Sequence, residues 1–201
     1  MVGRIAGVSP EETRTRLLHA AARVFAKQGY EGSRVGDIAR EAGLSSGAIY
    51  AHYDSKADLL VDAIRAHGPN ELGRLIDAGD VRVPLPELLV RLGASLEHRD
   101  ETQGSLLLEA MAASRRDPEL AAVLTASLAG RESLVSSLAR HGQHVGDIDP
   151  GVSADALARF SMLVVLGAMV ARVLDLPPTD PSEWTELITR LVDGVRTEEN
   201  P

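Results

Sequence analysis

The segment 33–60 has a residue pattern that indicates one particular local structure more specifically than any other part of this chain. Two helices that cross steeply around a tight turn need a small residue where they approach each other, and Ala39 meets that need. The turn itself needs a glycine that can adopt a positive φ, which Gly43 provides. Apolar residues flank both positions, namely Ile38, Leu44 and Ile49. The spacing therefore predicts two short helices joined by a tight turn.

The second of these helices has a start suited to a nucleic-acid groove. Ser45 stands where a hydroxyl can cap the first free backbone N–H groups. In a DNA-binding helix-turn-helix, the amino-terminal end of the second helix enters the major groove. The sequence thus predicts DNA binding by this segment. An ordinary helical hairpin inside a protein core is the alternative, and it would not require these spacings together.

At this point the chain shows a resemblance to a known family. Residues 10–60 resemble the DNA-binding domain of the tetracycline-repressor (TetR) family, over about a quarter of the chain. The segments that carry the resemblance are LLHAAARVFAKQGYEGS and DIAREAGLSSGAIYAHYDSK, followed by ADLL. Within them the family's residues occur in order, namely Gly29-Tyr30, Ile38-Ala39, Ala42-Gly43, Tyr50 and Lys56. The rest of the chain resembles the family in helical pattern and length.

The resemblance implies roles for individual residues. Tyr50 and Lys56 match positions that usually contact the DNA backbone, and His52 matches one that touches DNA in some members. The leading turn of the recognition helix, where base edges are read, is formed by Ser45, Ser46, Gly47 and Ala48. Plainer roles stay open, since Tyr50 could pack between helices and His52 could be a solvated surface residue.

Two departures from the family pattern affect the expected contacts. Arg34 stands where a capping Ser or Thr is usual. We therefore expect Ser33 to cap the first of the two short helices, over 35–42, and Arg34 to reach phosphate. The leading turn has no Arg, Asn or Gln for bidentate base contacts, so specificity would depend on serine hydroxyls, Ala48 and DNA shape. Arg4 and Arg14 are either further phosphate contacts or ordinary solvated charges.

The elements around this segment also have helical periodicity. No run alternates apolar and polar residues as a half-buried strand would, so the predicted fold is all-α. We expect helices over 10–29, 35–42, 45–53 and 55–66, a long connection over 67–86, and helices over 87–99, 103–115, 118–141, 153–175 and 181–196. The predicted organisation is a helix-turn-helix domain over 1–54, then a larger helical effector-binding and dimerisation domain over 55–201.

The charge distribution is compatible with this division. The net charge is −8, but residues 1–58 carry 8 basic and 7 acidic side chains, whereas the rest of the chain carries 13 and 22. A local cationic face is sufficient for phosphate contacts, because charges more than about 10 Å away are largely screened at physiological salt. The chain has no cysteine, which excludes disulfides and thiolate-bound metals.

Two apolar helices near the carboxyl end predict a dimer. Residues 160–174 are apolar around most of the helix, so more than one side must be covered. Two such helices from each subunit would form a four-helix interface, as the resemblance also implies, with Leu163, Leu166, Val170, Trp184, Leu187, Ile188 and Leu191 as interface residues. A central helix buried within a monomer is the alternative. A homodimer would read a roughly palindromic operator on double-stranded DNA.

The resemblance further implies a small-molecule effector that binds the larger domain and moves the helix starting near Ser55. Glu109 interrupts the apolar run Leu106–Met111, and a buried carboxylate needs a partner such as Arg115, Arg91 or a polar ligand. Other candidate pocket residues are Met111, Met162 and Met169. Core filling by the methionines, and an exposed or core-edge Glu109, are the alternatives.

Other functional classes have weaker support. The sequence contains no Gly-rich phosphate loop, nucleophile elbow or HExxH motif, so we expect no enzyme activity and no cofactor. His141 and His144, close to Asp147 and Asp149, lack the further ligands of a metal site. A helical protein-interaction module, or a small helical enzyme, is the alternative to a regulator. A repressor released by its effector is preferred by family habit alone.

The sequence also bears on location. The amino terminus has no apolar run of signal-peptide length. The run 160–174 is shorter than a bilayer span and includes Arg172. We therefore expect a cytoplasmic protein without membrane contact.

Overall fold

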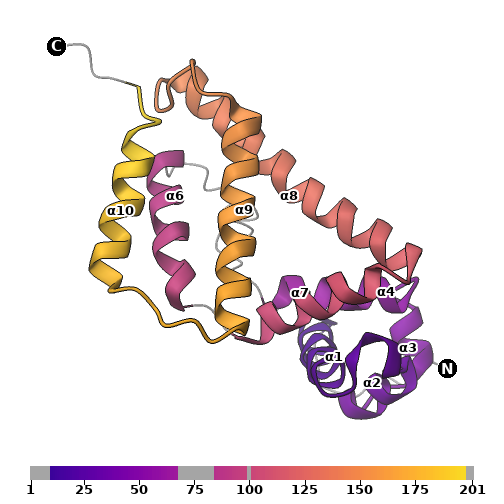
Figure 1. Cartoon of the computed structure of the whole chain (residues 1–201). Helices are drawn as coiled ribbons and strands as arrows, with labels where there is room; N and C mark the ends of the chain where they lie inside the picture. The colour runs from indigo at the N-terminus through magenta and orange to yellow at the C-terminus, as the bar shows by residue number, and fades with distance from the viewer. Residues whose placement is uncertain (1–9, 68–83, 99–100, 198–201) are drawn as a thin grey trace. The chain divides into compact units, whose positions relative to one another are not determined.

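The computed structural model describes residues 10–67, 84–98 and 101–197 (Figure 1). Within these ranges every regular element is a helix, which confirms the predicted all-α fold. The chain divides into two compact units, one formed by Met1–Gly68 with Thr102–Ser127 and the other by Pro69–Glu101 with Leu128–Pro201. Most of the predicted long connection lies outside the described residues, as does Arg4.

The first unit contains the predicted helix-turn-helix. Its helices are α1 (Pro10–Gly32), α2 (Val35–Ala42), α3 (Ser46–Tyr50), α4 (Lys56–Ala66), α7 (Glu101–Ser114) and the beginning of α8 (Pro118–Val145). Large side chains from all of these helices are fully buried, namely Phe25, Ile38, Ile49, Leu59, Leu60, Leu106 and Leu120. Full burial of one such side chain is worth roughly 1.5–3 kcal/mol, so this core holds the short helices together.

Local signals determine where the short helices begin and end. Gly43 adopts φ 67° and ψ 34°, and its N–H contacts the carbonyls of Ala39 and Arg40, as predicted for the turn. The Ser45 side chain accepts a hydrogen bond from the Ala48 N–H and so caps α3. Ser55 caps α4 in the same way, through the Asp58 N–H. The helix α3 ends at Tyr50, so it is shorter than the predicted range 45–53.

The helix α1 changes direction near its end. Gly29 has φ 71° and ψ 170°, a conformation outside the helical region that a residue with a side chain rarely adopts. The predicted helix end near Gly29 is therefore confirmed, although helical residues follow up to Gly32. Tyr30, directly after the break, is buried, with a relative exposure of 3%.

The second unit consists of α6 (Leu85–Ala94), a short 3-10 helix (Ser95–His98), the remainder of α8, α9 (Ala154–Val173) and α10 (Pro181–Asp193). The helices α6 and α10 lie side by side (Figure 1). A Cβ on Gly93 would lie only 2.6 Å from Ile188 Cγ2, so a glycine is needed for this close approach. Trp184 Nε1 donates a hydrogen bond of 2.9 Å to the Gly93 carbonyl at the same place.

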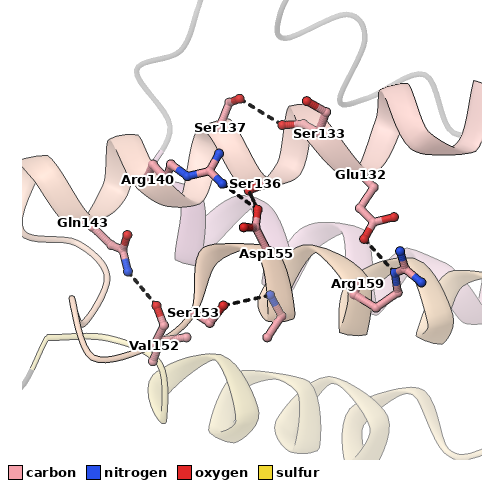
Figure 2. A network of polar contacts seen from close by, with 11 residues as sticks. Glu132, Ser133, Ser136, Ser137, Arg140, Gln143, Val152, Ser153, Asp155 and Arg159 are labelled. Atoms are coloured by element: carbon pink, nitrogen blue, oxygen red, sulfur yellow. Dashed lines mark hydrogen bonds and ion pairs between the residues drawn. The ribbon is translucent and has the colours of Figure 1, made fainter.

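Polar contacts join α8 to α9 (Figure 2). The Asp155 carboxylate accepts hydrogen bonds from the hydroxyl of buried Ser136 and from Arg140. The hydroxyl contact, followed by the nearby guanidinium, holds the pKa of Asp155 below its usual value. Further along, Arg159 Nε lies 2.7 Å from Glu132 Oε1. These contacts fix which side of α9 faces α8.

The rest of α9 is apolar and largely uncovered. The helix is 20 residues long, and only 17% of its apolar stretch is buried. By length and composition alone this helix could cross a membrane, because it is longer than the apolar run 160–174 that it contains. The helix extends beyond the apolar run because Ser153 caps it and the polar first turns continue it. A single helix of this kind is weak evidence for a membrane protein.

Candidate nucleic-acid interface

The short helix α3 presents most of the residues predicted to read DNA. Ile49 is buried and anchors the helix in the core, whereas Tyr50 is 57% exposed on the other side. The packing of Tyr50 between helices, which the sequence left open, is therefore not what the structure shows. Ser45, Ser46, Gly47 and His52 are exposed as well, and Ala48 is half-buried.

The start of α2 differs from expectation. The N-cap residue is Arg34, which has extended backbone angles and makes no side-chain capping bond. Ser33 is buried and its hydroxyl donates to the Tyr30 carbonyl at 2.8 Å, so the prediction that Ser33 caps this helix is wrong. The Ser33 hydroxyl is thus used by the last turn of α1 and is not available to cap α2. Arg34 is exposed, as the prediction of a phosphate contact requires.

Lys56 lies at the first position of α4 and makes contacts within the protein. Its ammonium donates to the carbonyls of Tyr30 and Ser33, at 2.7 and 3.2 Å. The same atom lies 4.1 Å from the centre of the Tyr30 ring, within the range of a cation–π contact. Partial burial lowers the pKa of Lys56, and the nearby carboxylates of Asp117 and Glu31 oppose that shift.

The basic side chain of Arg14 takes part in an internal ion pair. Its guanidinium lies 2.7 Å from Asp62 Oδ2, and the Tyr53 hydroxyl donates to that same oxygen at 2.9 Å. Burial, and then the hydrogen bond to Asp62, raise the pKa of Tyr53 to about 12. The sequence offered a phosphate contact or a solvated charge for Arg14, and did not indicate Asp62 as a partner. The two residues are 48 positions apart, so no local pattern connects them.

Glu109 has a partner that the sequence did not indicate. Its Oε1 accepts a hydrogen bond of 2.7 Å from the Tyr30 backbone N–H. Of the partners expected from the sequence, Arg91 is not the one that the structure shows, and a polar ligand stays a prediction. Arg91 instead pairs with Glu87 at 2.6 Å within α6. The break at Gly29 leaves the Tyr30 N–H without a helical acceptor, so the carboxylate replaces one.

The four predicted pocket residues are divided between the two units. Glu109 and Met111, both half-buried, belong to α7 in the first unit. Met162 is half-buried and Met169 buried in α9, in the second unit. Their role in effector binding stays a prediction.

A surface hollow of about 320 Å³ opens on the first unit beside α1 and the end of α2. It is lined by Arg16, His19, Arg23, Glu41 and Ala42. Arg16 donates to the Ala42 carbonyl at 3.1 Å, and Arg23 lies 2.9 Å from Glu41. The two arginines of this lining thus already have partners within the protein.

The predicted interface residues are of two kinds. Leu163, Val170, Leu187 and Leu191 are exposed, and Leu163 reaches 58%. Leu166 and Trp184 are half-buried, while Ile188 is buried against α6. The apolar stripe of α10 is thus divided, with one edge turned toward its own chain and another toward solvent.

Among residues 10–67, 84–98 and 101–197, no group of three or more His, Asp or Glu side chains could hold a metal ion. His141 and His144 are exposed at the end of α8.

Comparisons with known proteins agree with this geometry. Residues 17–63 match the family described as bacterial regulatory proteins, tetR family, and residues 87–197 match the carboxyl-terminal part of BetI-type transcriptional repressors. The chain is 26% identical over 159 residues to the HTH-type transcriptional regulator UidR of Escherichia coli K12, covering 79% of this chain and 81% of that protein.

Solved structures share the fold. A TetR-family transcriptional regulator from Rhodococcus sp. superposes with a TM-score of 0.72 at 22% identity, covering 93% of this chain and all of the other. A transcriptional regulator from Saccharomonospora viridis, solved in complex with choline, has a TM-score of 0.64 at 23% identity and covers 94% of this chain and 100% of that one. At these identities the likeness concerns the fold alone.

Proposed function

The chain belongs to the TetR family of DNA-binding transcriptional regulators, and from this premise we propose that two copies bind one palindromic operator and release it when a small molecule binds. The family consists of regulators rather than enzymes. Its members act on the chromosome, so we place this protein in the cytoplasm.

The observation that carries the proposal is the exposure of the outer side of α3. Ile49 holds the helix in the core while Ser46, Tyr50 and His52 face solvent. A recognition helix needs this combination, because base edges are read only by side chains that reach the groove while the helix itself stays fixed. Small residues in the leading turn let the backbone approach the bases closely.

We assign the phosphate contacts to Arg34, Tyr50, His52 and Lys56. Arg34 and Tyr50 are exposed and can reach a backbone oxygen. Lys56 has three N–H donors, of which two bond to the carbonyls of Tyr30 and Ser33, so one can reach a phosphate. A partly desolvated ammonium in a fixed position loses little freedom on binding, which favours this contact.

A second copy of the chain would cover the apolar side of α9 and the outer edge of α10. Leu163, Val170, Leu187 and Leu191 are large apolar side chains in contact with solvent. Monomeric soluble proteins rarely leave such residues together, and a symmetric partner is the commonest way to cover them. The dimer would place two recognition helices one DNA turn apart.

The effector and the direction of regulation follow from the likeness to relatives. The match of residues 87–197 to BetI-type repressors supports repression. The choline found in the Saccharomonospora viridis protein supports a small organic molecule as the class of effector. We propose that residues 55–201 form the domain that binds it, that Glu109, Met111, Met162 and Met169 lie near it, and that residues 1–54 bind DNA.

Selection of genomic fragments by the purified protein tests the proposal. We expect a protected, roughly palindromic site that binds more weakly as salt increases. Tyr50→Phe should weaken binding to all fragments alike, whereas Tyr53→Phe should not, because the Tyr53 hydroxyl is bonded to Asp62 inside the unit. Enrichment of no fragment, or capture of a protein partner without DNA, would favour the helical interaction module.

A further inference from the structure

The end of α1 lies at the centre of a cluster that joins the helix-turn-helix to α7 and α8. We define this Tyr30 cluster as Tyr30, Lys56, Glu109 and Asp117, all within the first unit. Three of its members bond to different atoms of the fourth. Their contacts run from the start of α8 to the start of α4.

The backbone of Tyr30 is fixed to α7. The Glu109 carboxylate accepts the Tyr30 N–H at 2.7 Å, and its Oε1 lies 3.0 Å from the position of a Cβ on Gly29. Any side chain at residue 29 would press on the carboxylate, in addition to the strain of φ 71°. The break in α1 therefore serves to expose one N–H group to α7.

The side chain of Tyr30 is fixed to the start of α8. Its hydroxyl donates to Asp117 Oδ2 at 3.0 Å, while Asp117 Oδ1 accepts the N–H groups of Glu119 and Leu120 at 3.0 Å each. Burial and the bond to Asp117 raise the pKa of Tyr30, and the Leu120 N–H is the largest cause that lowers the pKa of Asp117. The tyrosine is thus a neutral donor and the aspartate an anionic acceptor at neutral pH.

The opposite side of Tyr30 holds Lys56. The ammonium bonds to the Tyr30 carbonyl at 2.7 Å and lies 4.1 Å from the centre of its ring. A shift of Tyr30 by even 1 Å would lengthen the first contact beyond hydrogen-bond range. Such a shift would leave Lys56 with the Ser33 carbonyl as its remaining acceptor in this cluster.

We propose that Tyr30 is a positioning residue, which transmits the position of α7 and of the start of α8 to the phosphate-binding Lys56. The inference rests on the proposed DNA-binding role of Lys56. When α7 or the start of α8 moves, Tyr30 must follow its bonds to Glu109 and Asp117 or break them. In either case the carbonyl and ring that hold Lys56 change, and so does affinity for DNA. Because coupling between two binding events is reciprocal, DNA must in turn act on α7.

Amide hydrogen exchange with the selected operator fragment tests this inference without an effector. At saturating DNA we expect exchange over residues 104–120 of the wild type to slow by about threefold or more, as that segment opens less often. Tyr30→Phe keeps the ring, the cation–π contact and the backbone bond to Glu109 but removes the bond to Asp117, and should reduce the slowing, most of all at the start of α8. Tyr53→Phe is the matched control, since it removes a tyrosine–aspartate bond in the same unit without a link to α7 or α8.

Asp117→Ser provides an independent variant should Tyr30→Phe fail to fold. Serine preserves an N-cap for α8 while removing the carboxylate that accepts the Tyr30 hydroxyl, so the slowing should again be reduced. The inference is overturned if DNA leaves exchange over 104–120 unchanged in the wild type. It is also overturned if DNA slows exchange in the Tyr30→Phe and Asp117→Ser variants as much as in the wild type. Absence of DNA binding by the wild type would instead overturn the proposed function itself.

Discussion

The two units of this chain bury their apolar side chains to very different degrees. In the first unit, Tyr50 is the single large hydrophobic residue that stands exposed among the described residues, and it carries a hydroxyl. In the second unit, Phe160, Leu163, Leu187 and Leu191 are all about half exposed or more. The first unit faces solvent mostly with polar groups, whereas the second leaves large apolar side chains exposed, as the proposed dimer requires.

This difference separates two tasks that one regulator must perform. A DNA-reading surface has to remain wet and charged, because phosphates and base edges are bound through polar groups. A dimer surface has to be apolar enough to lose its water. The chain places the two surfaces in separate units, so each can be disturbed without the other.

The largest expected effect concerns the uncovered side of α9. Leu163→Glu places a charge where a partner would bury the leucine, so the dimer should dissociate at micromolar concentration. Operator affinity should fall by about 100-fold or more, because the second half-site no longer binds at a high effective concentration. Light scattering would give the mass and gel shift the affinity.

Thr179→Glu, in the exposed segment before α10, is the matched control and should remain dimeric. A dimeric Leu163→Glu variant with full affinity would contradict the assignment of α9 to the interface.

A smaller effect is expected at the polar surface of the first unit. Lys56→Gln keeps most of the side chain but removes the charge, so operator affinity should fall by about tenfold for all sequences. The slope of log affinity against log salt should become shallower by about 0.9, since one counterion fewer is released. Fluorescence anisotropy at several salt concentrations measures both.

Lys27→Gln, on the exposed side of α1, removes the same charge from the same unit and should leave the slope unchanged. Equal slopes for Lys56→Gln and the wild type would exclude a phosphate contact by Lys56.

The next prediction concerns a buried polar contact in the second unit, whose loss should lower stability. Ser136→Ala removes the buried hydroxyl that bonds to Asp155, and should lower the free energy of unfolding by about 1 kcal/mol. Ser137→Ala is the control, because the exposed Ser137 hydroxyl bonds only within α8, to the Ser133 carbonyl (Figure 2). Urea unfolding of both variants measures the difference.

The effect of Ser136→Ala should depend on pH in a defined direction. The pKa of Asp155 is lowered in the folded state, so its stabilising contribution is full above the ordinary aspartate pKa and is lost as the pH falls below about 4. The two serine variants should therefore converge in acid. A difference that does not decrease at all as the pH falls below the ordinary aspartate pKa would mean that packing, not the carboxylate, accounts for the loss.

The smallest effect is expected at the leading turn of α3. Ser46→Ala removes an exposed hydroxyl without changing the helix, so affinity for the selected operator should change by about threefold while the ranking of sequences shifts. Repeating the fragment selection with this variant would reveal the shift. An unchanged ranking would place the reading of sequence elsewhere on the unit.

The sequence predicts most accurately where a structural rule is local. Gly43 and Ser45 determine a turn and a cap within four residues of themselves, and both predictions are confirmed. Ser33 shows the limit of the same rule, because its hydroxyl bonds to the carbonyl of Tyr30, three residues earlier, and does not cap α2.

Contacts between distant segments were not predictable from a single sequence. The Glu109–Tyr30 bond joins residues 79 positions apart, and the Trp184–Gly93 bond joins residues 91 apart. Periodicity identified the stripe on α10, but it cannot tell that Ile188 faces α6 while Leu187 faces solvent. The exposure of the side chains that we propose to bind DNA was thus easier to predict than the contacts that hold the elements carrying them.

The contact of Gly93 with Ile188 has a consequence for how this protein can diverge. Since even one methyl group at residue 93 would overlap the isoleucine, a mutation there is viable only in a background that already carries a smaller residue at 188. The reverse order is open, because shortening residue 188 first leaves a tolerable void. Drift at this pair therefore has a preferred order of steps, and a descendant chain that differs at residue 93 should differ at residue 188 as well.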